Sequence, residues 1–194
     1  ELYAEYYGKA FRDANLENNL QLQITAGIIA FLGSIHLDHI EPVLDILDVI
    51  DLMTFHSCIY KLHEMELVDI CRDKAVAISD QCFANFILKH VFIDKKAISL
   101  AEMLDTCFQI YRERTIQAVN TLIGVFQSPE VINFTEHEIK VVWKKRKNES
   151  FSRYWEWVKV FYPINQEEAL LLIKEQIDKI EKVNISISDI DISN

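Results

Sequence analysis

Glycine and proline are scarce in this sequence. The 194 residues include only 4 glycines and 3 prolines. Folds built from many short strands need frequent glycine and proline at their turns, so this scarcity argues against an all-β fold. Half of the residues are apolar, and most of them recur at the three- and four-residue spacing of helices. The sequence therefore predicts a mainly α-helical protein.

Basic residues are also too few to balance the acidic ones. Lysine and arginine total 20 against 30 aspartates and glutamates, giving a formal net charge of −10. An acidic surface repels a polyanion, so extensive neutralisation of nucleic-acid phosphates is not expected. No apolar run reaches the roughly 20 residues of a membrane-spanning helix. Neither nucleic acid nor a membrane is an expected partner.

Cysteine occurs without the paired spacing of a zinc site or a disulfide framework. The four cysteines are far apart in the sequence: Cys58, Cys71, Cys82 and Cys107. No C-x-x-C pair is present, and three of the four fall on apolar helical faces, where a free thiol behaves as a small hydrophobe. This pattern favours a reducing compartment, and we expect a cytoplasmic protein.

The sequence also lacks the signatures of catalysis. There is no glycine-rich phosphate loop, no G-x-S-x-G and no H-E-x-x-H. Two histidine pairs, His36 with His39 and His56 with His63, have no third ligand nearby, whereas a zinc site needs three or four. Solvated histidines are the simpler interpretation. We expect no catalytic site, metal or cofactor within this chain.

Helical spacing begins at the first residue. Glu1 takes the place of a methionine, so we expect a piece of a larger protein whose missing part lies upstream. The pattern predicts a linker helix within residues 1–20, a winged-helix domain over residues 21–98 and a helical region over residues 99–194.

Three helices and a hairpin are predicted in the middle segment. A nearly all-apolar helix over Ile24–Ile35 should be central; the next two helices should be capped by Asp38 and Thr54. Two alternating runs, Leu67–Cys71 and Ala75–Ile78, flank a charged turn and predict a β-hairpin. This order is typical of a winged helix, a variant of helix-turn-helix with the hairpin as its two-stranded wing.

Beyond residue 98 the pattern is wholly helical and predicts an α-helical bundle. The expected boundaries are a helix from a capping box at Ser99 to about Phe126, one from a capping box at Thr135, one from Ser150 or Ser152 to Pro163, and a last one capped by Asn165. After Val183 the alternating pattern allows a strand or disorder. The helix after Ser150 is rich in aromatic residues: Phe151, Tyr154, Trp155, Trp157, Phe161 and Tyr162. Such a cluster could cradle a base, but aromatics at helical spacing are more often core.

Two groups of polar residues are candidate contact sites. A helix capped by Asp80 and running to Val91 is apolar on more than one side, so we expect it to pack on both the winged helix and the tail. Asp80, Gln81, Asn85 and Phe86 are candidates for interdomain contact on this helix, with Phe86 fully buried; a local cap is the simpler role for Asp80.

A basic run at the end of another helix is a weaker candidate for anion or nucleic-acid contact: Lys140, Lys144, Lys145, Arg146 and Lys147. Cations at a helix C-terminus are also explained by the helix dipole.

The helix after Thr54 stands where a DNA-recognition helix would stand. Its outward residues are expected to be His56, Ser57, Tyr60, Lys61, His63, Glu64 and Glu66. One lysine against two glutamates is a poor reader of phosphates, because a DNA-binding face is normally basic. A packing or hinge role for this unit is favoured over DNA binding.

Three segments together resemble a known family. These are Ile24–Ile35, Phe55–Cys71 with "KLHEMELVDI", and Ala75–Asp94 with "AVAISDQCFANFILKHVFID". They are similar to the winged-helix region of bacterial STAND-type signal-transduction NTPases, which are related to NACHT and apoptotic ATPases. In that class a P-loop domain precedes a helical lid, a winged helix and further helices.

The resemblance implies a regulatory role. It implies that the winged helix packs on an upstream nucleotide domain, holds the off state and swings when the nucleotide exchanges, after which the protein oligomerises. ATP and Mg²⁺ would belong to that upstream domain, and sister subunits would be further partners. A nucleotide-contacting histidine of the family has only His56 and His63 as candidates here, so no binding residue is carried over. The alternatives are a DNA-binding transcription regulator with a helical dimerisation region, and an adaptor that binds another protein's helix.

Overall fold

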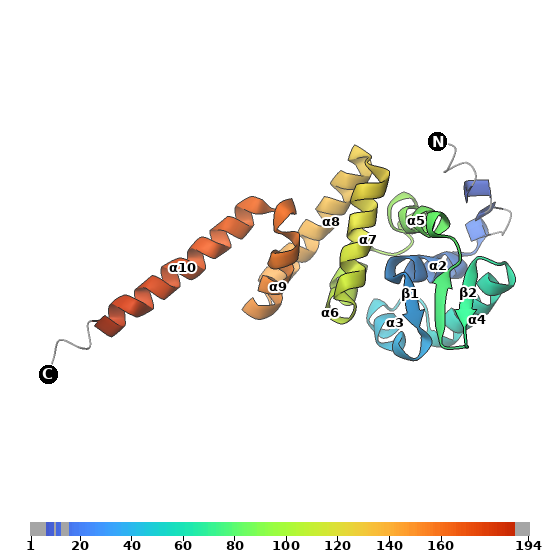
Figure 1. Ribbon diagram of the computed structural model, residues 1–194, viewed down its shortest axis with the longest axis horizontal. Helices are drawn as coiled ribbons and strands as arrows, with labels where there is room; N and C mark the ends of the chain where they lie inside the picture. Colours follow the sequence, from blue (N-terminus) through green and yellow to red (C-terminus); the bar gives the residue numbers. More distant parts are fainter. Residues whose placement is uncertain (1–6, 10, 13–15, 189–194) are drawn as a thin grey trace. The chain divides into compact units, whose positions relative to one another are not determined.

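The computed structural model describes residues 7–9, 11–12 and 16–188, with side chains up to Lys179. The described chain is mainly helical and contains one small antiparallel sheet (Figure 1), which confirms the predicted class. Contacts divide the chain into two compact units, Glu1–Glu138 and Ile139–Asn194. The sequence placed a boundary near residue 98, whereas here the stretch from 99 to 138 belongs to the first unit. Of the expected N-terminal linker helix, residues 7–9 and 11–12 are helical, and the rest lies outside the described residues.

Helix α2 (Leu20–Leu32) is the centre of the first unit. It follows the short η1 (Leu16–Asn18), and the side chain of Asn19 caps it by accepting a hydrogen bond from the backbone N–H of Leu22 at 3.1 Å. The sequence-based limits of Ile24–Ile35 were wrong at both ends. Gly33, at φ 75°, ends the helix in a conformation that favours glycine, and the chain then turns into a strand.

A close approach between α2 and a later turn makes Gly27 a test of this packing. A Cβ at Gly27 would lie 2.6 Å from Cγ1 of Val91, and the β-branched valine has little freedom to move away. We expect Gly27→Ala to destabilise the first unit by about 1–3 kcal/mol through overpacking. Val91→Ala in the same chain should recover part of this loss, as measured by denaturant unfolding. Purely additive losses would contradict the contact.

Two predicted helix caps are wrong. Helix α3 (Glu41–Leu47) begins after the short η2 (Leu37–His39), with Ile40 at its N-cap, so Asp38 does not cap it. Helix α4 (Leu52–Glu64) is capped by Asp51, whose Oδ1 accepts from the Thr54 N–H at 2.9 Å. The Thr54 hydroxyl donates to Asp51 Oδ2 at 2.6 Å, and these hydrogen bonds hold the Asp51 pKa below its usual value. A carboxylate three residues upstream therefore takes the capping role predicted for Thr54.

The predicted hairpin is present and carries an additional strand. Strands β2 (Val68–Cys71) and β3 (Ala75–Ile78) pair antiparallel, with Asp69 opposite Ala77. Strand β1 (Ser34–His36) pairs with the free edge of β3, so the sheet order is β1-β3-β2. The two-stranded expectation was therefore incomplete.

Helix α5 (Gln81–Lys89) follows the sheet and continues into η3 (His90–Asp94), a turn of π-helix. Asp80 caps α5 as predicted, because its Oδ1 accepts from the Phe83 N–H at 2.7 Å. Helix α6 (Leu100–Ile110) begins at the predicted Ser99 cap, and Ser99 Oγ accepts from the Glu102 N–H at 3.3 Å. α5 packs on both α2 and α7 (Arg112–Phe126), as its wide apolar surface predicted.

A single helix from Ser99 to Phe126 was a wrong prediction. The chain breaks between α6 and α7 at Tyr111, where φ is −130° and ψ is 51°. The Tyr111 hydroxyl donates to the carbonyl of His39 at 2.9 Å. The break lets α6 pack on α3 while α7 packs on α2.

Helix α8 (Pro129–Lys147) contains the boundary between the two units. The capping box predicted at Thr135 is wrong, because Thr135 lies inside this helix and its hydroxyl donates to the Val131 carbonyl at 2.8 Å. Glu138, the other half of that box, instead accepts from the backbone N–H of Ala101 at 3.2 Å.

The second unit consists of the end of α8, α9 (Phe151–Phe161), the short η4 (Tyr162–Ile164) and α10 (Gln166–Ser188). Its core includes Trp143, whose Nε1 donates to the Tyr154 hydroxyl at 3.0 Å, and Trp157. The start of α9 after Ser150 and the position of Pro163 agree with the sequence. α10 continues through Ser188, so the strand or disorder considered after Val183 is not found there; the residues after Ser188 lie outside the described part.

Candidate functional site on helix α5

The N-terminal residues and helix α5 are joined by a hydrogen bond. The hydroxyl of Tyr7 donates to Oδ1 of Asp80 at 3.2 Å. The same oxygen accepts the capping bond from the Phe83 N–H. Asp80 thus combines the two roles that the sequence had set against each other: it is a local cap, and it contacts a distant segment.

An aromatic cluster extends this contact along the outer face of α5. The ring of Phe86 lies 6.4 Å from that of Tyr7, 5.9 Å from that of Phe11 and 5.4 Å from that of His90, centroid to centroid. Phe11 is also 4.7 Å from His90 and is buried. Offset and tilted pairs at such separations are favourable. The rings therefore hold Tyr7 and Phe11 against the start and the end of α5.

Phe86 is half-buried, and its expected full burial is a correction. The fully buried residues of α5 are on its inner side and include Phe83 and Ile87. Phe86 faces the N-terminal residues and is half-buried there. The two amide side chains of the candidate group bond to each other, with Gln81 Nε2 donating to Asn85 Oδ1 at 3.1 Å. Among the four candidates, the structure therefore brings Asp80 and Phe86 to a shared contact and leaves Gln81 and Asn85 beside it.

The Tyr7–Asp80 bond predicts a measurable coupling energy. Asp80→Ala should cost about 1 kcal/mol for the lost cap, and Tyr7→Phe about 0.5–1 kcal/mol for the lost hydrogen bond. Because both changes remove the same bond, the double variant should lose less than the two single losses added together. Denaturant unfolding of the four proteins measures this difference. Strict additivity would show that the N-terminal residues do not rest on α5.

His90 closes the cluster at the π-helical turn. Its side chain is mostly buried, and Nε2 has no hydrogen-bond partner among the described residues. Burial lowers the pKa of His90 from its ordinary value of 6.5, opposed mainly by the nearby charge of Asp94. A protonated ring would bury a charged N–H without an acceptor, so the neutral ring is favoured.

The lowered pKa makes stability depend on pH. As pH falls below about 6.5, the unfolded chain binds a proton at His90 that the folded chain does not. The free energy of unfolding therefore decreases as the pH decreases. His90→Phe keeps an aromatic ring in the stack and should make the free energy of unfolding flatter between about pH 7.5 and 5.5. Chemical denaturation at a series of pH values tests this. Equal slopes in the two proteins would contradict the burial of a neutral imidazole.

The basic run near the end of α8 does not form a common anion-binding surface. Arg146 is buried, and its guanidinium carbon lies 4.9 Å from the centre of the Trp157 ring. Lys147 forms an ion pair with Glu168 on α10, which raises the Lys147 pKa. Lys140 is half-buried. Lys144, Lys145 and Lys147 are exposed, and with Lys147 paired this is a small set for phosphate binding.

The outward face of α4 carries most of the residues expected there. Ser57, Tyr60, Lys61 and Glu64 are exposed and His56 is half-buried, while Glu66 lies beyond the end of the helix. His63 Nδ1 lies 2.8 Å from the carbonyl oxygen of Val68. His36 and His39 stack with centroids 4.7 Å apart. No group of three or more potential metal ligands is gathered among the residues that the structure describes.

The cysteines are reduced in the structure, with Cys58 and Cys107 buried, Cys82 half-buried and Cys71 exposed. Burial raises the pKa of the Cys107 thiol to about 12. This inert thiol has the packing role expected for cysteine on an apolar helical face.

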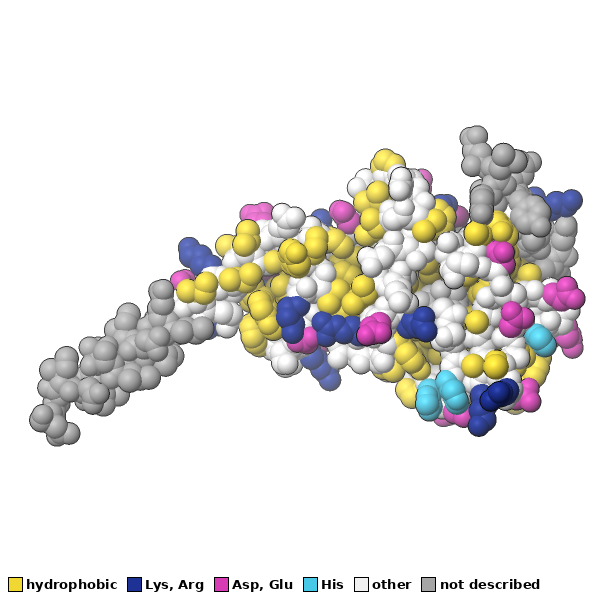
Figure 2. Space-filling model, in the orientation of Figure 1, with side chains coloured by type: hydrophobic (Ala, Val, Ile, Leu, Met, Phe, Trp, Pro, Cys, Tyr) yellow, Lys and Arg dark blue, Asp and Glu magenta, His cyan; other side chains and the backbone are white. Residues whose placement is uncertain are grey.

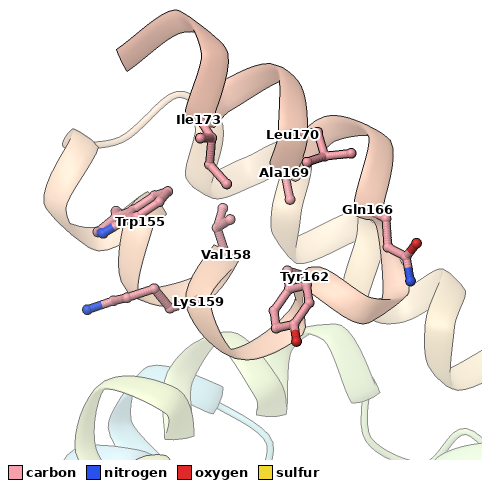
Figure 3. A pocket seen from close by; sticks show the side chains of 8 residues that line it. All are labelled: Trp155, Val158, Lys159, Tyr162, Gln166, Ala169, Leu170 and Ile173. Atoms are coloured by element: carbon pink, nitrogen blue, oxygen red, sulfur yellow. The ribbon is translucent and has the colours of Figure 1, made fainter. Parts of the chain in front are cut away.

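The aromatic helix α9 is mostly core, but one side of it is open. Tyr154, Trp157 and Phe161 are buried. Trp155 and Tyr162 instead line a groove of about 580 Å³ with Val158 of α9 and Leu170 of α10, and their side chains face one another across it (Figure 3). This groove was not predicted, because helical spacing alone does not tell which aromatic side chains remain uncovered.

No helix in the described part of the chain has the length and apolar character needed to cross a membrane. Comparisons with protein-family models, with curated proteins and with solved structures find no match to this chain.

Proposed function

We propose that this chain is a non-catalytic regulatory module of a multidomain NTPase, in which a winged helix and its following helices relay the nucleotide state of an upstream ATPase domain. The contact between the N-terminal residues and α5 carries the proposal. Residues that lead in from an upstream domain would pass Tyr7 and Phe11, which rest on Asp80 and Phe86. Movement upstream would thus act directly on α5.

The position of α5 supports a relay. Its inner side packs on α2 and α7, so it joins the early helices to the later ones. Its outer contact with the described N-terminal residues includes a hydrogen bond from Tyr7 and ring pairs with Phe86. Contacts of this size contribute only about 1 kcal/mol each. They can therefore break and re-form without unfolding the unit.

The element order supports the winged-helix part of the proposal. Helices α2, α3 and α4 precede a β2–β3 hairpin, and β1, between α2 and α3, completes the sheet on the β3 side. A helix, a short strand, two helices and a hairpin in this pairing are compatible with a winged helix, a variant of helix-turn-helix. α4 would be the recognition helix and the turn of the hairpin would be the wing.

DNA binding is the weaker alternative. The exposed charges of α4 are Lys61 and Glu64, and the turn of the hairpin adds Arg72 and Lys74 around Asp73. The local charge is nearly neutral, whereas affinity for DNA rests on neutralised phosphates. Duplex titration at physiological salt should give no binding tighter than micromolar; a nanomolar dissociation constant would favour the transcription regulator.

The test compares the isolated chain with the intact protein that contains it. Calorimetry of the chain with ATP and Mg²⁺ should show no binding, whereas the intact protein should bind and hydrolyse ATP. In the intact protein Phe86→Ala should speed ADP release, because it weakens the contact that holds the off state. Asn85→Ala, on the same helix but outside the ring cluster, is the control. Equal ADP release from wild type and Phe86→Ala, or an intact protein without nucleotide binding, would refute the proposal.

A further inference from the structure

Helix α10 has an apolar stripe that the second unit leaves uncovered. Its inner side buries Ala169 and Leu172, whereas Leu170, Ile173 and Ile177 are 65%, 41% and 50% exposed. These three follow each other at intervals of three and four residues, so they lie on one face of the helix. Figure 2 shows hydrophobic side chains gathered over α9 and the described part of α10. The apolar face of α10 is therefore wider than the part of it that the second unit buries.

The stripe has the spacing of a coiled coil. In the sequence the same three–four alternation continues from Leu170, Ile173 and Ile177 to Ile180, Asn184 and Ile187, and the backbone is helical to Ser188. These are a and d positions of a heptad, with one asparagine at an a position. A single asparagine there sets register and strand number when such helices pair. The stripe spans roughly 25 Å at about 1.5 Å per residue.

The groove beside the stripe enlarges the apolar surface. Two and a half heptads are fewer than the roughly three or four that usually form a coiled coil. The groove adds Trp155 and Tyr162, and Leu170 and Ile173 belong to both groove and stripe. Each partner in a stable dimer buries about 800 Å². Large exposed side chains, with on the order of 100 Å² each, supply much of this area. The exposed ones on the stripe and beside the groove are Phe151, Tyr162, Leu170, Ile173 and Ile177.

We propose that the occupant of this surface is a second copy of the chain, whose α10 lies along the stripe and groove to form a four-helix arrangement with two-fold symmetry. A heptad stripe is complementary to itself, because its knobs fit the holes formed by the same pattern. The e and g positions that flank the stripe are Lys174, Gln176, Glu181 and Val183, so two copies do not oppose rows of like charge despite the acidic chain. The inference does not depend on the proposed NTPase role.

Sedimentation equilibrium of the full chain tests the proposal. Wild type should be a dimer with a dissociation constant in the micromolar range or below. Leu170→Ser with Ile177→Ser should weaken dimerisation by about a hundredfold or more, since each change removes a large apolar side chain from the interface. Glu175→Ser with Lys179→Ser is the matched control: it keeps the net charge, introduces the same two serines into α10 outside the stripe, and should remain dimeric.

Circular dichroism of each variant shows whether the helices remain, so loss of dimer is separated from loss of fold. A wild-type chain that stays monomeric at about 100 μM would overturn the proposal and leave the stripe to another occupant, such as a different protein. Equal weakening by the stripe variant and the control would also overturn it.

Discussion

Replacing Phe83 by alanine should destabilise the first unit by about 3–5 kcal/mol, the usual loss when a buried phenylalanine is truncated. Phe83 is only 4% exposed and lies on the inner side of α5. Phe86→Ala is the matched control, with the same residue type on the same helix. Because Phe86 is half-buried among the outer rings, its removal should cost clearly less, on the order of 1–2 kcal/mol. Denaturant unfolding followed by circular dichroism measures both.

The relative stability losses of the two phenylalanine variants distinguish two descriptions of α5. The sequence predicted that Phe86 is fully buried and that its truncation costs about 3–5 kcal/mol. In the structure Phe83 is the more buried of the two, although its ring also lies 5.8 Å from that of Tyr7, and Phe86 is half-buried against Phe11. A larger loss for Phe86→Ala would mean that the outer face of α5 is covered much more than the structure shows.

Replacing Trp157 by alanine should destabilise the second unit by about 3–5 kcal/mol or more. Its side chain is completely buried, its ring centre is 4.3 Å from that of Phe161, and the guanidinium of Arg146 lies over it. Truncation would leave a large cavity and take the aromatic face away from a buried cation. Trp155→Ala, on the groove side of the same helix, is the control and should cost much less.

Hydrogen exchange shows which helices each substitution destabilises. In Trp157→Ala, protection should fall in α9, α10 and the end of α8, while α2 to α7 keep theirs. This follows from the division at Glu138–Ile139. If α6 and α7 lost protection together with α9, the division near residue 98 that the sequence predicted would describe the cooperative units better.

Elements with a strong local signal were predictable. Asp80 precedes an apolar helix and caps it, and the alternating runs on both sides of a charged turn form the hairpin. Strand β1 was missed because three residues cannot display alternation. They were assigned to the preceding helix, although the positive φ of Gly33 ends it. No glycine or proline occurs at the break at Tyr111, so no local pattern indicates it. The break is explained by the packing of α6 and α7 on different helices.

Residue type alone was an unreliable sign of a helix cap. Thr54 and Thr135 both have the residue pattern of a cap, but neither caps its helix. The Thr135 hydroxyl donates inside its own helix, and the Thr54 hydroxyl donates to Asp51 upstream. For the candidate site, the sequence indicated Asp80 and Phe86 through their position between two apolar segments. It could not identify Tyr7 and Phe11 as their partners, because that contact joins residues more than seventy positions apart and no local pattern encodes it.

The central claim is that α5 relays a nucleotide state from upstream. Hydrogen exchange of the intact protein, saturated in turn with ADP–Mg²⁺ and with a non-hydrolysable ATP analogue, tests it most directly. The account predicts a change in protection at Tyr7–Arg12 and along Gln81–Lys89 between the two nucleotides, and none in the core of the second unit around Trp143 and Trp157. Identical protection of α5 and the N-terminal residues in both nucleotide states would contradict it.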